Sequence, residues 1–169
     1  YMSSVTLELT IDVDNAVTLD APQRVVTRTL PGGSSVDVYT HHADPAMASP
    51  TMPDELYEFA VVTPPGYDGQ TLFPLRLRLH GVDGSPDEAV DVTDTIDLWP
   101  HDLLNTWWTG HADTFPAGDP TAGTVRRYTE IRVLAVLDWV IANYAVDPDA
   151  VFEPYTLEDN DWSKYLKLN

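Results

Sequence analysis

The sequence contains no cysteine, so disulfide bonds, thiolate metal sites and cysteine nucleophiles are excluded for this chain. Lysine occurs only twice, at Lys164 and Lys167, and 9 basic residues face 27 acidic ones, which gives a formal net charge of −18. A protein of this charge repels phosphate backbones and anionic membranes, which argues against nucleic-acid binding. No apolar run reaches the length of a transmembrane helix, so we predict no membrane span.

Of the 169 residues, 43% are hydrophobic and 10% are aromatic, a composition typical of a folded globular protein. This length suffices for one ordinary core, or for one core and a short arm. The acidic excess is typical of the solvated surface of a secreted or salt-adapted protein, so we predict an extracellular location. A surface that binds cations or a cationic partner is the alternative.

The acidic residues do not form a recognisable metal site. The aspartates between residues 87 and 97 are not spaced as in a calcium-binding EF-hand loop. Weak Ca²⁺ binding by Asp83, Asp87 or the cluster at 159–161 stays open as an alternative. Residues 41–44 hold two histidines and an aspartate, but a metal site would need further ligands, so we interpret them as a polar loop. We predict neither a metal nor a cofactor.

The first third of the chain predicts an antiparallel β arm. Residues 4–13 alternate between apolar and polar side chains, the period of a half-buried strand. Residues 24–29 and 35–40 predict two further strands, separated by a Pro-Gly-Gly break. We therefore expect residues 1–54 to form an N-terminal β arm followed by a linker.

Residues 55–152 predict a layered α/β sheet. Strands are expected at 56–63 and 72–79, and a helix at 85–97 with Ser85 as its N-cap. The strongest helix prediction covers 124–144, with Thr124 as a cap, and a further strand begins at 150–152. Alternation of strands and helices favours an α/β architecture. Residues 153–169 lack a clear period and are expected to form a C-terminal tail.

Three segments carry a resemblance to a known family. Residues 62–68 read Val-Thr-Pro-Pro-Gly-Tyr-Asp, residues 73–81 run from Phe-Pro-Leu to Leu-His-Gly, and residues 128–151 end in Tyr-Ala-Val-Asp-Pro-Asp-Ala-Val. In this order and spacing they resemble the N-terminal half of secreted α/β-hydrolase esterases of the polyhydroxybutyrate depolymerase and feruloyl esterase type. The resemblance implies a partial α/β-hydrolase-like sheet with flanking helices, here preceded by the N-terminal antiparallel β arm.

The resemblance also implies a site. In that family His80, Gly81 and Val82 would form an oxyanion turn, and a G-x-S-x-G nucleophile turn with a later Asp and His would follow. The sequence contains no G-x-S-x-G. We therefore expect a hydrolase-like fragment or subunit whose Ser-Asp-His triad lies outside this chain. A non-catalytic extracellular binding or assembly module, and an enzyme of another chemistry, are the alternatives.

Aromatic residues suggest where a substrate would lie. Trp107, Trp108 and His111 are candidates for a platform that binds a sugar or an aromatic acyl group of an ester or carbohydrate-linked substrate. Core packing beneath a loop is the alternative for these residues. Arg76 and Arg78 lie on a strand that is normally apolar, which predicts an open or acid-lined face. An incomplete sheet would leave an edge after residue 151, where a partner chain could complete it.

Overall fold

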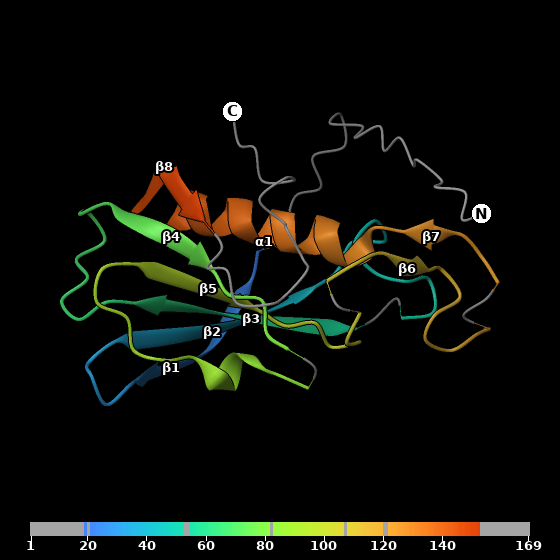
Figure 1. Cartoon of the computed structure of the whole chain (residues 1–169), viewed down its shortest axis with the longest axis horizontal. Helices are drawn as coiled ribbons and strands as arrows, with labels where there is room; N and C mark the ends of the chain where they lie inside the picture. Colours follow the sequence, from blue (N-terminus) through green and yellow to red (C-terminus); the bar gives the residue numbers. More distant parts are fainter. Residues whose placement is uncertain are drawn as a thin grey trace, which may run out of the picture.

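A computed structural model describes residues 19, 21–52, 55–81, 83–106, 108–119 and 122–152. The strand predicted at 4–13 and the predicted tail at 153–169 lie outside these residues. The described part is a mixed α/β structure, dominated by strands, with one α-helix. Figure 1 shows the helix lying along a twisted sheet.

Six strands form the main sheet, in the spatial order β1-β2-β3-β5-β4-β8. The first three pairs, β1 with β2, β2 with β3 and β3 with β5, are antiparallel, whereas β4 pairs parallel with both β5 and β8. A second, two-stranded sheet pairs β6 with β7. The strands are β1 (Gln23–Thr29), β2 (Ser35–His42), β3 (Leu56–Thr63), β4 (Phe73–Leu77), β5 (Ile96–Pro100), β6 (His111–Ala112), β7 (Val125–Arg126) and β8 (Val146–Phe152).

The two strands expected in the N-terminal arm are continuous with the rest of the sheet. β2 pairs with β3 over its whole length, from Ser35 opposite Thr63 to His42 opposite Leu56. β1 covers the outer side of β2 and forms one edge of the sheet. Residues 23–42 thus share one sheet with β3, β4 and β5.

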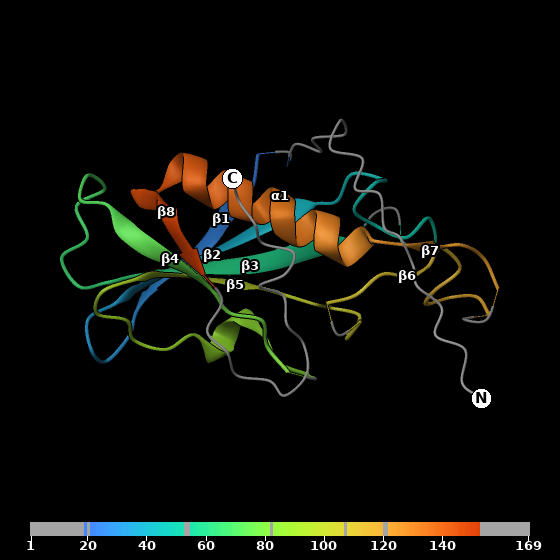
Figure 2. The same ribbon diagram turned by 45° about the horizontal axis from the view of Figure 1, so that its top comes forward.

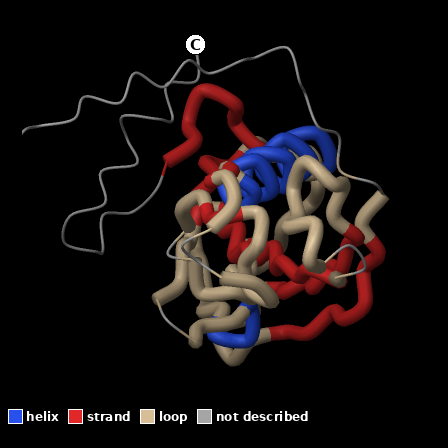
Figure 3. Tube along the Cα trace, turned by 90° about the vertical axis from the view of Figure 1, so that its right-hand side faces the viewer, coloured by secondary structure: helices blue, strands red, loops and turns tan. Residues whose placement is uncertain are grey.

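Apolar side chains of the central strands point alternately to the two faces of the sheet, so that a hydrophobic core forms on each face. On β3, Phe59 and Val61 join the cluster that contacts the α-helix, whereas Ala60 and Val62 join a smaller cluster on the opposite face. This is the two-residue period of a strand that is buried on both sides. Figure 3 shows the α-helix and the short helix η1 (Pro86–Glu88) on opposite sides of the strands.

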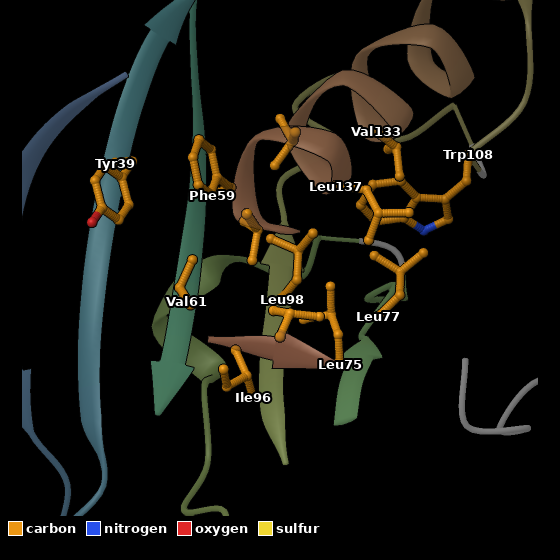
Figure 4. Packing of buried hydrophobic residues seen from close by; sticks show 13 residues of the cluster. Tyr39, Phe59, Val61, Leu75, Leu77, Ile96, Leu98, Trp108, Val133 and Leu137 are labelled. Carbon is orange, nitrogen blue, oxygen red and sulfur yellow. The ribbon is translucent and has the colours of Figure 1, made fainter. Parts of the chain in front are cut away.

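Helix α1 (Tyr128–Asn143) covers the larger core. Its buried side chains pack on residues of β3, β4 and β5, as Figure 4 shows for Val133 and Leu137. Leu134 is exposed, so only one side of the helix faces the sheet. The prediction of a long helix in this region is confirmed, but its start at Thr124 is wrong. Residues 125–126 form β7, and the helix begins after its N-cap residue Arg127.

The helix predicted at 85–97 is also wrong. Only one 3₁₀ turn forms there, with the predicted N-cap Ser85 accepting a hydrogen bond of 3.2 Å from the Asp87 N–H. Residues 96–100 instead form β5, which lies between β3 and β4. Ile96 and Leu98 face α1, and Asp97 between them is neutralised by a neighbouring arginine. The long-range ion pair lets an acidic segment become a central strand.

In the part of the chain that the structure describes, no helix has the length and apolar character needed to cross a membrane.

Candidate functional site

The candidate site lies where the parallel strands end. His80 follows β4, Asp102 follows β5, and the first turns of α1 begin at the same edge, as Figure 2 shows for the helix beside β6 and β7. The antiparallel strand β3 begins at this edge, close to Tyr57. Open α/β sheets bind ligands outside the carboxyl ends of their strands. This edge therefore brings together polar residues that are far apart in the sequence.

His80 is held by hydrogen bonds on both ring nitrogens. Its Nε2 accepts a hydrogen bond of 3.0 Å from the Asp102 N–H, so the ring proton must lie on Nδ1, which lies 2.6 Å from the Gly81 carbonyl oxygen. Trp108 donates from Nε1 to the His80 carbonyl oxygen at 3.0 Å and packs edge-on against the imidazole. His80 is therefore a buried neutral residue that positions the turn.

The turn itself is tight. The Gly84 N–H donates to the Gly81 carbonyl oxygen at 3.2 Å, the same oxygen that His80 contacts. A Cβ added to Gly84 would lie 2.6 Å from the Cβ of His80, whereas one added to Gly81 would meet nothing within 4 Å. Close packing thus requires glycine at 84, and Gly81 leaves its side of the turn open. Val82, the third residue of the predicted oxyanion turn, lies outside the described residues.

A buried carboxylate ties the end of β5 to the start of α1. Asp102 is 2% exposed, and its two oxygens lie 3.1 and 3.0 Å from Thr106 Oγ1. Thr106 Oγ1 also contacts Thr129 Oγ1 at 3.0 Å. The Trp108 N–H adds a longer contact of 3.4 Å to Asp102. These bonds fix the loop that carries His101 and the backbone N–H that holds His80.

Arg132 and Tyr57 form a second buried polar pair at this edge. The Arg132 guanidinium lies 3.9 Å above the Tyr57 ring centroid and donates to the Met47 carbonyl oxygen at 3.1 Å. The Tyr57 hydroxyl is buried and has no hydrogen-bond partner among the described residues. Burial lowers the pKa of Arg132 and raises the pKa of the Tyr57 hydroxyl. The Tyr57 hydroxyl, which lacks a partner among the described residues, is able to bind a small polar group.

Burial keeps the nearby imidazoles neutral. It lowers the pKa of His41 to about 4 and also lowers the pKa of His101. Burial raises the pKa of Glu130, one of whose carboxylate oxygens has no hydrogen-bond partner within the described chain. No group of three or more metal-binding side chains forms within the residues that the structure describes.

The structure joins only some of the residues predicted from sequence. His80, Gly81 and Trp108 lie together, and Trp108 is buried in the core cluster next to α1. His111 lies apart from them on β6, where its ring packs against Phe115 and Tyr128. Trp107 lies outside the described residues.

Sequence reasoning missed Tyr57, Asp102, Thr106 and Arg132. Asp102 follows β5, a strand that was not predicted and whose first two residues fell within the predicted helix at 85–97, so its place at the edge was hidden. The signal that could have found it is the alternation of apolar residues Ile96 and Leu98 with polar neighbours. Comparison of this chain with protein-family models and with curated proteins gives no match, so the function of this edge is inferred from its own geometry.

Proposed function

We propose that the chain is the first half of an α/β-hydrolase-type scaffold of a carboxylic-ester hydrolase, and that it contributes the oxyanion turn. The observation that carries this proposal is the place of the His80–Gly81 turn, three residues after the end of β4, a strand that lies between two parallel neighbours. Backbone N–H groups that follow such a strand can stabilise the negative charge that develops on an ester carbonyl oxygen.

The arrangement of the strands supports the same proposal. The antiparallel β3 lies beside β5, and β5 connects through α1 to β8, which is parallel to β4. In an α/β-hydrolase the nucleophile lies on a sharp turn between a parallel strand and a helix. In this chain that strand would be β8, and the residues after Phe152 lie outside the described part.

The proposal divides the chemistry between this chain and the rest of the enzyme. A serine from outside the chain would attack the ester carbonyl carbon while a histidine base takes its proton, and the alcohol would leave with that proton. Water would then release the acid from the acyl-enzyme. The contribution of this chain is the turn at residues 80–82, because both ring nitrogens of His80 are already engaged.

The experiment uses the product of the full open reading frame that encodes the chain, assayed with p-nitrophenyl butyrate. Val82→Pro removes one backbone N–H from the turn and is expected to lower kcat by about a hundredfold to a thousandfold, with a small change in KM. Gly81→Ala is the control, because it keeps the N–H and its Cβ meets open space. The isolated 169-residue chain is expected to show no serine-dependent turnover.

Two outcomes would count against the proposal. Turnover by the isolated chain that a serine-directed inhibitor abolishes would show that a nucleophile is present here. An inactive full-length product would remove the hydrolase proposal and favour the binding module.

One observation favours the alternative of a non-catalytic binding or assembly module. Among the described strands β8 forms an edge of the main sheet, and several of its residues are exposed. An unpaired edge strand can pair with a strand of another chain. Sedimentation analysis distinguishes the two proposals, since a module that completes its sheet with a partner should associate, whereas a monomer would contradict edge pairing.

A further inference from the structure

Two arginines share one carboxylate on the sheet face opposite α1. Asp97 on β5 is fully buried, and both of its oxygens accept hydrogen bonds from Arg76 on the neighbouring strand. Arg78 donates from Nε to the same carboxylate at 3.0 Å, and Thr95 donates to it at 2.8 Å. One carboxylate therefore serves two guanidinium groups.

Because two arginines share one carboxylate, one of their two positive charges is not balanced. Arg76 and Arg78 form no ion pair with any other described acidic residue. The arginines of β1 differ, since Arg24 and Arg28 each pair with an aspartate of their own. A chain with a net charge of −18 thus has a local excess of positive charge beside a central strand.

Arg78 is oriented for binding. Its guanidinium is fixed by Asp97 on one side and lies 5.7 Å from the centroid of the Trp99 ring. Its two terminal nitrogens, Nη1 and Nη2, make no hydrogen bond within the described chain, and 24% of the side chain is exposed. A planar fork of two N–H donors matches the two oxygens of a carboxylate. Because the guanidinium is already held in place, little side-chain entropy is lost when a ligand binds.

Apolar side chains flank the two arginines on the neighbouring strands. Phe152 on β8 pairs in register with Arg76, and 42% of its surface is exposed. On the other side, Trp99 of β5 lies next to Arg78. A ligand whose carboxylate contacts Arg78 would therefore have the Trp99 ring beside it, and Phe152 next to Arg76 offers apolar surface for a short hydrocarbon chain.

We infer that Arg78, supported by Arg76, Asp97 and Trp99, forms a binding site for a small organic acid that carries an apolar group. The inference does not depend on the proposed hydrolase function, because neither the His80 turn nor a nucleophile takes part. The site would accept the carboxylate through the free Nη1 and Nη2 of Arg78 and the hydrocarbon part beside Phe152.

The test is an NMR titration of the full chain with hexanoate at low ionic strength, observing the Arg and Trp side-chain N–H signals. The wild-type chain is expected to bind one hexanoate with saturation. Arg78→Gln should lower the affinity by about tenfold to one hundredfold, the value of a hydrogen-bonded charge pair. Asp97 keeps its three hydrogen bonds from Arg76 in this variant, so the fold should persist, and circular dichroism verifies it.

Arg126→Gln is the matched control, because it removes the same charge from an exposed residue of β7 and should leave hexanoate affinity unchanged. Absence of saturation in the wild type, or equal affinity in Arg78→Gln, would overturn the site. If acetate bound as tightly as hexanoate, the proposed contact between the hydrocarbon chain and the apolar side chains would be wrong. If inorganic phosphate bound as tightly as hexanoate, the proposal that the site prefers a carboxylate would be wrong. Tighter binding of a glutamate-containing peptide would overturn a small acid as the ligand.

Discussion

Neutralising Asp97 should cost far more stability than neutralising an exposed aspartate. Asp97→Asn keeps the shape of the side chain and removes the charge that Arg76 and Arg78 share. The remaining amide can accept hydrogen bonds on one oxygen only, whereas the carboxylate accepts from three side chains. Both guanidinium groups then lose their counter-ion.

The structure sets the size of the effect. Removing one partner of a buried ion pair typically destabilises a protein by about 3–5 kcal/mol. The arginine side chains are 21% and 24% exposed, so water still solvates part of each charge. We therefore expect a loss near the lower end, about 3 kcal/mol in the free energy of unfolding. For a chain of this size that corresponds to a fall in Tm of about 6–12 °C.

The matched control is Asp87→Asn. Asp87 pairs with Arg28 at 3.0 Å, but its side chain is 82% exposed. Exposed pairs contribute about 0–1 kcal/mol, so this variant should unfold at nearly the wild-type urea concentration. Urea unfolding followed by far-ultraviolet circular dichroism measures both variants without relying on the fluorescence of Trp99. Equal losses in the two variants, or a loss at Asp97 below that at Asp87, would refute the argument from burial.

Three further predictions concern the carboxyl edge of the sheet. Gly84→Ala should destabilise by about 1–3 kcal/mol, because the new methyl group would overlap His80, and urea unfolding measures the loss. Tyr57→Phe should leave stability unchanged or raise it by up to about 1 kcal/mol, because the hydroxyl that it removes is buried without a partner among the described residues. His41 has its pKa lowered to about 4, so the unfolded chain takes up its proton first and stability falls as the pH drops from 6.5 to 4. His41→Gln should flatten this part of the stability profile by an amount on the order of 3 kcal/mol, measured by urea unfolding across that pH range.

Each of these predictions has a control within the same chain. Gly81→Ala meets open space and should be far milder than the change at Gly84, so equal losses would contradict the packing around His80. Tyr39→Phe removes a hydroxyl that lies 2.7 Å from the Tyr144 hydroxyl, and it should cost about 1 kcal/mol. A larger loss for Tyr57→Phe than for Tyr39→Phe would show that the Tyr57 hydroxyl has a partner. An unchanged pH profile in His41→Gln would mean that His41 titrates normally.

Local patterns predicted the elements that depend on their own residues. The strands at 23–29, 35–42 and 56–63 follow from runs of β-branched and alternating side chains, and α1 follows from a stretch without proline or glycine. The turn after β4 was also predictable, because a strand that alternates leucine runs directly into His80 and Gly81. These features need only local backbone preferences and the side-chain period.

The candidate site was only partly predictable, because its residues come together through long-range contacts. His80, Gly81 and Trp108 were identified, but Tyr57, Asp102 and Arg132 reach the same edge from three other parts of the chain. The role of these residues depends on whether their buried polar atoms have hydrogen-bond partners in the fold. Partners that are distant in the sequence cannot be recognised from a local sequence pattern.

By itself the sequence determined the acidity of the chain, the exclusion of cysteine chemistry, the absence of G-x-S-x-G and most of the individual strands. Only the tertiary structure decided that residues 96–100 become β5 and enter the sheet between β3 and β4. The physical reason is the Asp97 carboxylate, which can be buried in a central strand only because Arg76 and Arg78, about twenty residues earlier, lie beside it. Local sequence preferences do not reveal an ion pair whose partners are brought together only by the pairing of strands that are distant in the sequence.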